Sequence, residues 1–245
     1  MLEELLEKLH LTTKNAYDYS RKNKSKKKKL KKKFIYKNRV RESVFFMLSL
    51  NGSYIISLSC MVLFRDGLIR SETYVKILFA YTCLTVLLGV FYLPYKLKHY
   101  GLNRKKLIYN LKMGSLLGLI GLILAVLIRI SLVKSGRLEF RFRAIPEWEF
   151  FLYPFSVMAQ ETMIRGYLQS YFISLFDGSK KNEFVAIFLS SIIFGIMHLM
   201  YGFILAGLAF LFSIILGYFY RKSESLVGVL IIHFMTGTAM FYFKH

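Results

Sequence analysis

Residues 108–132 read IYNLKMGSLLGLIGLILAVLIRISL, an apolar run with two charged side chains, Lys112 and Arg129. A helix needs roughly 20 predominantly apolar residues to cross the hydrocarbon core of a bilayer. This run is long enough, and similar blocks recur on both sides of it. Hydrophobic residues make up 55% of the 245 residues, in long blocks separated by short basic loops, which globular chains rarely show. The sequence therefore predicts a polytopic membrane protein.

Blocks of this kind predict an all-α fold, a polytopic transmembrane helical bundle of about seven spans, with roughly six or eight as alternatives. Only Met200, Tyr201 and Gly202 separate the fifth block from the sixth. We expect this pair to form a tight helical hairpin that turns within the lipid. The expected spans lie near residues 43–64, 75–94, 108–132, 149–174, 184–199, 201–220 and 225–243.

The N-terminal part of the chain has a different composition. Residues 21–41 contain 13 Lys or Arg and no acidic residue, which is most of the formal net charge of +21. Such a run often indicates nucleic-acid binding. This one directly precedes the first span, where basic residues are attracted to anionic lipid headgroups. We therefore expect residues 21–41 to bind lipid headgroups, and we expect no nucleic acid as a partner.

Residues 1–14 carry leucines at helical spacing, which is typical of a short amphipathic helix. The chain is accordingly divided into an amphipathic and polybasic N-terminal segment, residues 1–42, and a transmembrane domain, residues 43–245. By the positive-inside rule, the basic loops place the N-terminus in the cytoplasm and the C-terminus outside. We expect an integral protein of the cytoplasmic, or inner, membrane. The basic loop 133–147 argues against this orientation.

Four ionisable side chains lie inside the expected spans: Glu161 and Arg165 in the fourth, His198 at the end of the fifth and His233 in the seventh. A charged residue at mid-helix costs about 2.5–3.5 kcal/mol on insertion scales, so it is a functional-site hypothesis by default. Glu161 and Arg165 are expected to pair, since positions i and i+4 share a helix face. From a rise of about 1.5 Å per residue, Glu161 and His233 lie at similar depth, and His198 comes out nearer the external side by about 9 Å.

The sixth expected span carries a face of small residues, Gly202, Ala206, Ser213 and Gly217. Small residues let helix backbones approach closely in membranes. We expect this face to bring the histidine-bearing helices against the helix that carries Glu161.

A carboxylate with two histidines inside a membrane fits two chemistries. In the first, the carboxylate and one imidazole take a proton from water as it attacks an amide carbonyl, while the other histidine or a nearby amide stabilises the oxyanion. In the second, Glu161, His198 and His233 bind zinc, with water in the fourth position. The HExxH spacing is absent, so no local motif supports a metal. An ion or proton pathway is a further minor alternative.

Other motifs point to no cofactor. Cys60 and Cys83 each lie inside an apolar span, where we interpret them as packing residues without a disulfide. The sequence contains no CxxC, no Gly-rich phosphate loop and no GxSxG elbow. Redox, nucleotide and serine-hydrolase functions therefore receive no support from motifs.

In order and context the polar motifs resemble the CPBP family of intramembrane glutamic proteases, also called Abi or CAAX-protease-like proteins. The signature of that family is EExxxR on one helix, FxxxH on the next, and later FxxGxxxGxxY and HxxxN. The resemblance covers roughly residues 149–240 and implies an intramembrane endopeptidase acting on a membrane protein or peptide. Here the motifs appear as Gln160-Glu161-xxx-Arg165, Phe194-xxx-His198, Phe210-xx-Ser213-xxx-Gly217-xx-Tyr220 and His233-xxx-Gly237.

Carried over by position, Glu161 matches the second acid of the signature, Arg165 its arginine, and His198 and His233 its two histidines. The resemblance thus implies that these four residues are catalytic.

Two positions depart from the signature. Gln160 stands where the first glutamate belongs, and Gly237 stands where the asparagine belongs. In the family the first glutamate is assigned to activate water with the FxxxH histidine, and the asparagine is assigned to the oxyanion. Two hypotheses follow: an endopeptidase that uses Glu161 in place of the first acid, and a catalytically weak or inactive relative that acts as a membrane scaffold or regulator.

Overall fold

The structure is a computed structural model that describes residues 40–93, 97–136, 148–176 and 179–239, together with residues 38, 139–140 and 243–244. The expected amphipathic helix 1–14 lies outside these residues, as does most of the polybasic run 21–41. The boundary expected at residue 42 stays a prediction.

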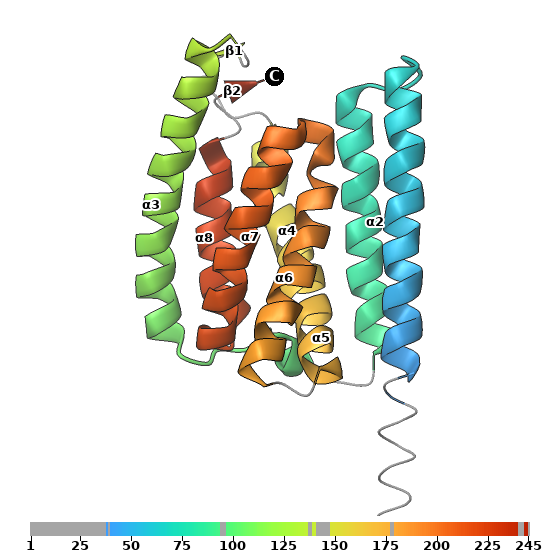
Figure 1. The fold of residues 1–245 in the computed structure, drawn as a ribbon, viewed down its shortest axis with the longest axis vertical. Coiled ribbons are helices and arrows are strands. Elements are labelled where there is room, and N and C mark those ends of the chain that lie inside the picture. Colours follow the sequence, from blue (N-terminus) through green and yellow to red (C-terminus); the bar gives the residue numbers. More distant parts are fainter. Residues whose placement is uncertain are drawn as a thin grey trace, which may run out of the picture.

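The described residues form an all-α bundle, as expected, with one minimal pairing of two short strands (Figure 1). Before α2 stands a helix that we call the N-terminal helix, Val40–Arg65. The elements that follow are α2 (Ser71–Tyr92), η1 (Leu97–Tyr100), α3 (Leu107–Lys134), β1 (Glu139–Phe140), α4 (Trp148–Glu161), η2 (Thr162–Gln169), α5 (Ser170–Leu175), α6 (Lys180–Met197), η3 (Leu199–Tyr201), α7 (Phe203–Ser223), α8 (Leu226–Thr238) and β2 (Phe243–Lys244).

Each of the expected spans coincides with a helix or, for the fourth, with a stack of three helical segments. Within the described residues, four helices are long and apolar enough to cross a membrane: the N-terminal helix, α2, α3 and α7. Asn182–Met197 and Leu226–Thr238 are shorter apolar helices. The remaining span consists of α4, η2 and α5 in succession. The chain is an integral membrane protein.

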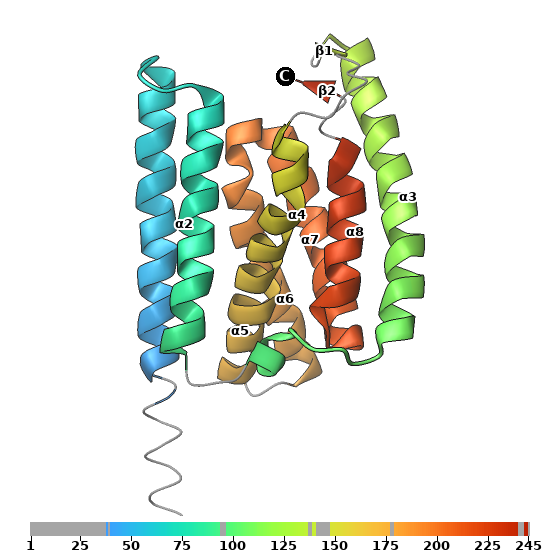
Figure 2. The same cartoon turned by 180° about the vertical axis from the view of Figure 1, so that it is seen from behind.

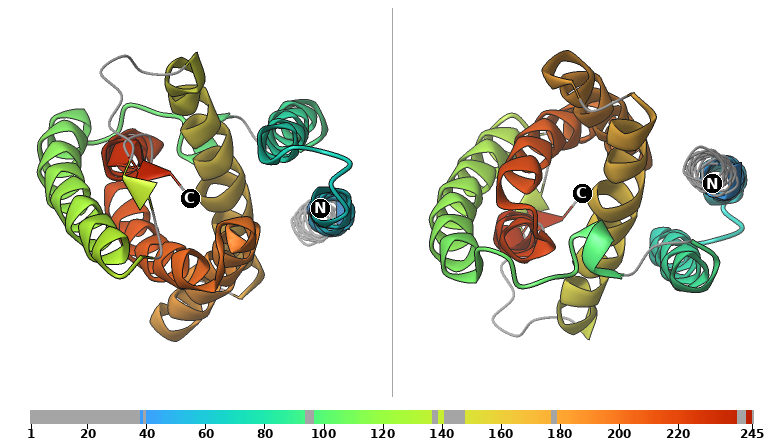
Figure 3. Two further views of the ribbon diagram at one scale, coloured as in Figure 1. Left: turned by 90° about the horizontal axis from the view of Figure 1, so that it is seen from above. Right: turned by 90° about the horizontal axis from the view of Figure 1, so that it is seen from below.

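The helices run side by side along one common direction (Figures 1 and 2). Seen along that direction, α3 to α8 form a curved group, and the N-terminal helix with α2 forms a pair beside it (Figure 3). α2 contacts this group through α4 and η2. The two sides of the chain are therefore joined at the helical stack that carries Glu161 and Arg165.

The expected hairpin between the fifth and sixth spans is formed by α6 and α7. Between them lies only the single 3-10 turn η3, flanked by His198 and Gly202. Gly202 has φ of 93°, a backbone conformation that is costly for residues with a Cβ. His198 caps the end of α6 at this turn. The hairpin therefore fixes one of the candidate site residues at its tip.

α3 packs on α8 through glycines within the run 108–132. Asn110, Gly114 and Gly118 are the buried residues of α3. A Cβ added at Gly114 would lie 3.0 Å from the Cα of Gly228. Because small residues of this spacing let two backbones meet, α8 is held by close backbone approach as well as by apolar side chains.

The substitution Gly114→Ala is expected to destabilise the protein by about 1–3 kcal/mol, since the new methyl group meets backbone that cannot rotate away. Gly207→Ala is the matched control, because nothing lies within 4 Å of a Cβ at that helical position. We expect the control to be neutral or slightly stabilising. Thermal unfolding of both purified variants in detergent measures the difference, and equal stabilities would contradict the packing.

Candidate active site

Glu161 lies at the point where the helical stack changes from α-helix to π-helix. α4 ends at Glu161, and η2 is a π-helix whose residues, Thr162–Gln169, are all buried. The sequence predicted one uninterrupted helix over 149–174, whereas the structure has a π-helix at Thr162–Gln169 within that span. The Ser170 hydroxyl donates to the Arg165 carbonyl at 3.1 Å, which satisfies a backbone acceptor in the altered turn. Single π-turns inside α-helices occur frequently at functional sites.

The Glu161 carboxylate is fully buried and contacts one guanidinium and one imidazole. Its Oε1 accepts from Nδ1 of His233 at 2.6 Å. Its Oε2 lies 3.2 Å from Nε of Arg165, and both of those side chains have 0% exposure. Each carboxylate oxygen therefore has its own partner, one from the same stack of helices and one from α8.

Arg165 is held in turn by α7. Its Nη2 donates to the Ser213 hydroxyl at 2.5 Å, and its guanidinium lies over the Phe194 ring, 5.8 Å from the ring centroid. One turn further, Nε2 of Gln169 donates to the carbonyl of Gly217 at 3.0 Å. Residues 165 and 169 thus meet residues 213 and 217, so equal spacing on the two helices produces two parallel polar contacts.

His198 lies beside this network and contacts Phe194 of its own helix. Its Nδ1 is 2.8 Å from the Phe194 carbonyl on its own helix. The Phe194 ring is 4.4 Å from the His198 ring and 5.6 Å from the His233 ring, measured between centroids. Phe194 therefore packs against both imidazoles. The structure brings Glu161, Arg165 and His233 into direct contact, and His198 joins them through Phe194.

The two departures from the family signature have distinct structural settings. Nε2 of Gln160 donates to the Ser156 hydroxyl of its own helix at 3.0 Å. At Gly237, an added Cβ would overlap the hydroxyl of Tyr153. The first position is thus engaged locally, and the space beside the second is filled by a tyrosine from α4.

Sequence reasoning identified Ser213 only as a packing residue and did not identify Tyr153. Ser213 is fully buried, and its hydroxyl anchors Arg165. The signal was its spacing of four residues from Gly217, which matches the spacing of Arg165 and Gln169. No sequence signal marked Tyr153, because it lies two helical turns before Glu161 and its neighbour at position 237 is a glycine.

The donor set does not assemble into a metal site. Among the described residues, no group of three His, Cys, Asp or Glu side chains lies close enough together to hold a metal ion. His198 directs Nδ1 to a backbone carbonyl instead of toward Glu161. The zinc arrangement of Glu161, His198 and His233 is therefore not formed. Cys60 and Cys83 are both free thiols.

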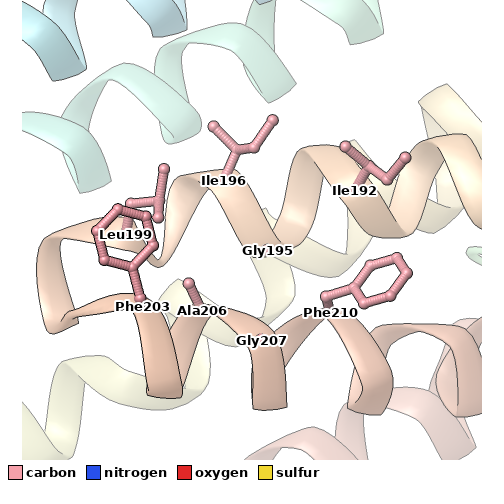
Figure 4. A pocket seen from close by; sticks show the side chains of 8 residues that line it. All are labelled: Ile192, Gly195, Ile196, Leu199, Phe203, Ala206, Gly207 and Phe210. Carbon is pink, nitrogen blue, oxygen red and sulfur yellow. The ribbon is translucent and has the colours of Figure 1, made fainter.

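An apolar groove of about 330 Å³ lies between α6 and α7 (Figure 4). The four candidate site residues are not among those that line it. It begins at the hairpin tip, where Leu199 follows His198, and runs along both helices. Its lining consists of Ile192, Gly195, Ile196, Leu199, Phe203, Ala206, Gly207 and Phe210.

Fold and site together define a polytopic helical membrane protein with a buried carboxylate, guanidinium and imidazole network. Residues 147–239 match the model of the family described as "Type II CAAX prenyl endopeptidase Rce1-like". This match supports the resemblance to CAAX-protease-like proteins. No curated protein and no solved structure gives a significant match. The matched region runs from the start of α4 to the end of α8, so it contains all four candidate residues.

The buried pair predicts a large loss of stability when one partner is removed. Arg165→Met leaves the Glu161 carboxylate buried with one partner fewer, and breaking a buried pair in this way costs about 3–5 kcal/mol. The double variant Glu161→Gln, Arg165→Met should lose much less than the sum of the two single losses.

The control is Arg221→Met, which removes the partly exposed pair between Arg221 and Glu183 across α7 and α6. Because exposed pairs contribute about 0–1 kcal/mol, this variant should remain close to the parent. Unfolding of the detergent-purified proteins measures all four variants. Additive losses in the double variant would show that Glu161 and Arg165 are not energetically coupled.

Proposed function

We propose that the protein is an intramembrane endopeptidase that hydrolyses a peptide bond in a membrane-associated protein or peptide. The observation that carries the proposal is the 2.6 Å contact between Nδ1 of His233 and Oε1 of Glu161. A carboxylate that accepts from one nitrogen of a histidine fixes the ring tautomer and stabilises the imidazolium that forms when the other nitrogen takes a proton. Glu161 and His233 are thus arranged as a base and its orienting carboxylate.

The proton acceptor is an imidazole, because both Glu161 oxygens already have partners. A carbonyl can only accept, so His198 donates from Nδ1 to Phe194, and its Nε2 is left as the acceptor in the neutral ring. His233 donates from Nδ1 to Glu161, which leaves its Nε2 in the same state. We assign His233 as the general base, since the carboxylate supports its protonated form, and His198 as a second acceptor that orients the water.

The proposed reaction is a single hydrolysis. Nε2 of His233 takes one proton from water as the water oxygen bonds to the carbonyl carbon, and the carbonyl electron pair moves onto its oxygen. When the carbonyl re-forms, the carbon–nitrogen bond breaks and the leaving nitrogen takes the proton from His233. Arg165 keeps the Glu161 carboxylate oriented, and Ser213 keeps Arg165 in place.

The family description supports a prenylated C-terminus as one substrate class. Peptide precursors and membrane-anchored sorting signals are the other classes, and the site does not choose among them. We propose the cytoplasmic membrane as the location, with the N-terminus in the cytoplasm and residues 21–41 on anionic headgroups. This orientation is supported by the basic end of the bundle, where Nζ of Lys106 donates to the carbonyl of Lys222 at 2.8 Å.

Glu161→Gln and His198→Ala should each abolish processing in cells while the protein still accumulates in the membrane. The measurement compares peptide termini in membranes from cells with and without the gene, and then with each variant. Glu183→Gln is the matched control, since it neutralises a glutamate that pairs with Arg221 at the edge of the bundle. Unchanged processing in both site variants would falsify the protease assignment.

A second candidate function is a catalytically inactive membrane scaffold or regulator. The observation that favours it is the setting of Gln160, whose amide is bound to Ser156 where the family has an acid. In this case the buried polar groups bind one another and have only a structural role, which is to hold α7 and α8 against the helical stack. These groups belong to Glu161, Arg165, His233 and Ser213.

Gln160→Glu separates the two functions. If the protein is a scaffold, this substitution leaves every phenotype unchanged, whereas Glu161→Gln lowers the amount of folded protein in the membrane. If the protein is a protease, a second acid one residue from Glu161 raises processing above the parent level. The comparison of peptide termini measures processing, and quantitative blotting of the membrane fraction measures the amount of protein.

A further inference from the structure

Tyr153 places a phenol hydroxyl beside His233. Its side chain is 7% exposed, and its ring lies 6.4 Å from the His233 ring, near perpendicular to it. The hydroxyl occupies the space over Gly237 that the first side-chain atom of any larger residue would take. Residue 237 is one turn from His233 on the same face of α8. A hydrogen-bond donor from α4 thus stands where α8 itself has none.

Tyrosine hydroxyls that cover helical glycines occur elsewhere in this protein and have a packing role. Tyr81 covers Gly52 and donates to the Ser49 carbonyl at 2.7 Å, and Tyr167 covers Gly89 and donates to the Val86 carbonyl at 3.1 Å. Tyr153 covers Gly237 in the same way, and its hydroxyl donates to the His233 carbonyl at 3.4 Å.

The position of Tyr153 differs from that of the other two tyrosines. Its ring contacts His233 and, at 5.7 Å between centroids, Phe234 of α8. Tyr81 contacts the N-terminal helix and Tyr167 contacts α2, away from both histidines. Tyr153 therefore covers a helical glycine, as the other two tyrosines do, and in addition contacts the site residue His233.

We propose that the Tyr153 hydroxyl is the oxyanion donor of this site, which would make Tyr153 a catalytic residue; this rests on the proposed endopeptidase function. The tetrahedral intermediate carries two oxygens on one carbon. The base contacts one of them at about 2.6–3.2 Å, and the donor contacts the other at about 2.7–3.1 Å. A base and a donor that are about one helical turn, or about 5.4 Å, apart can therefore serve the same carbon.

In the attack step, the electron pair of the carbonyl moves onto its oxygen as the water oxygen bonds to the carbon. The Tyr153 proton forms a hydrogen bond to this oxygen and stays on the phenol. When the carbonyl re-forms, that hydrogen bond weakens and the carbon–nitrogen bond breaks. Tyr153 thus contributes only while the negative charge exists, so its loss lowers kcat and leaves KM nearly unchanged.

The test uses the full chain in membranes, with the peptide that the termini comparison identifies as the substrate. Tyr153→Phe removes the hydroxyl and keeps the ring, and should lower kcat by about 10²–10³-fold with little change in KM. Tyr81→Phe is the matched control and should keep the parent kcat. Tyr153→Ala should have a kcat as low as that of Tyr153→Phe. Adding Gly237→Asn to Tyr153→Ala should raise kcat at least tenfold, because the asparagine amide then enters the space that the tyrosine hydroxyl vacated.

Rates are normalised to the amount of folded protein, so a drop in accumulation does not hide the result. A parent-like kcat in Tyr153→Phe, or equal losses in Tyr153→Phe and Tyr81→Phe, overturns the donor assignment while Glu161→Gln remains inactive and the protease function stands. If the parent and Glu161→Gln process the peptide equally, the endopeptidase function itself fails and the donor assignment falls with it.

Discussion

A single carboxylate, removed from water, imposes the arrangement of the helices around it. Glu161 is fully buried, so its charge needs partners that arrive from elsewhere in the bundle. Arg165 supplies one from the same stack of helices, and His233 supplies the other from α8. Arg165 then needs an acceptor of its own, which α7 provides through Ser213. Three separate parts of the chain are therefore fixed relative to one another by the requirements of one acid.

Close packing makes these contacts possible. α8 reaches the carboxylate because α3 packs against it through Gly114, where the two backbones nearly touch, and through Gly118, which lies against the Met235 side chain. On the other side, the turn at Gly202 returns α7 directly along α6, so that Ser213 faces the π-helix. Lipid offers little hydrophobic driving force between helices, and small residues with buried hydrogen bonds supply the association instead.

Much of this arrangement could be predicted from the sequence. The apolar blocks predicted the helices, because the length and hydropathy of a block identify a membrane span. The four-residue spacing of Glu161 and Arg165 predicted their ion pair. The π-helix could not be predicted, because the residue types of 162–169 are compatible with an α-helix as well as with a π-helix. The role of Tyr153 was also hidden, because it depends on which helix faces Gly237, and only the packing of α4 against α8 decides that.

The paired contacts between the helical stack and α7 also set the register of α7. Arg165 and Gln169 bind Ser213 and the Gly217 carbonyl, two positions with the same four-residue offset. A slip of α7 by one residue would turn both partners away together, so no intermediate position retains half of the bonding. The two contacts together therefore permit only one register of α7. Because the short turn η3 joins α6 to α7, this register also sets the position of His198 along the bundle axis.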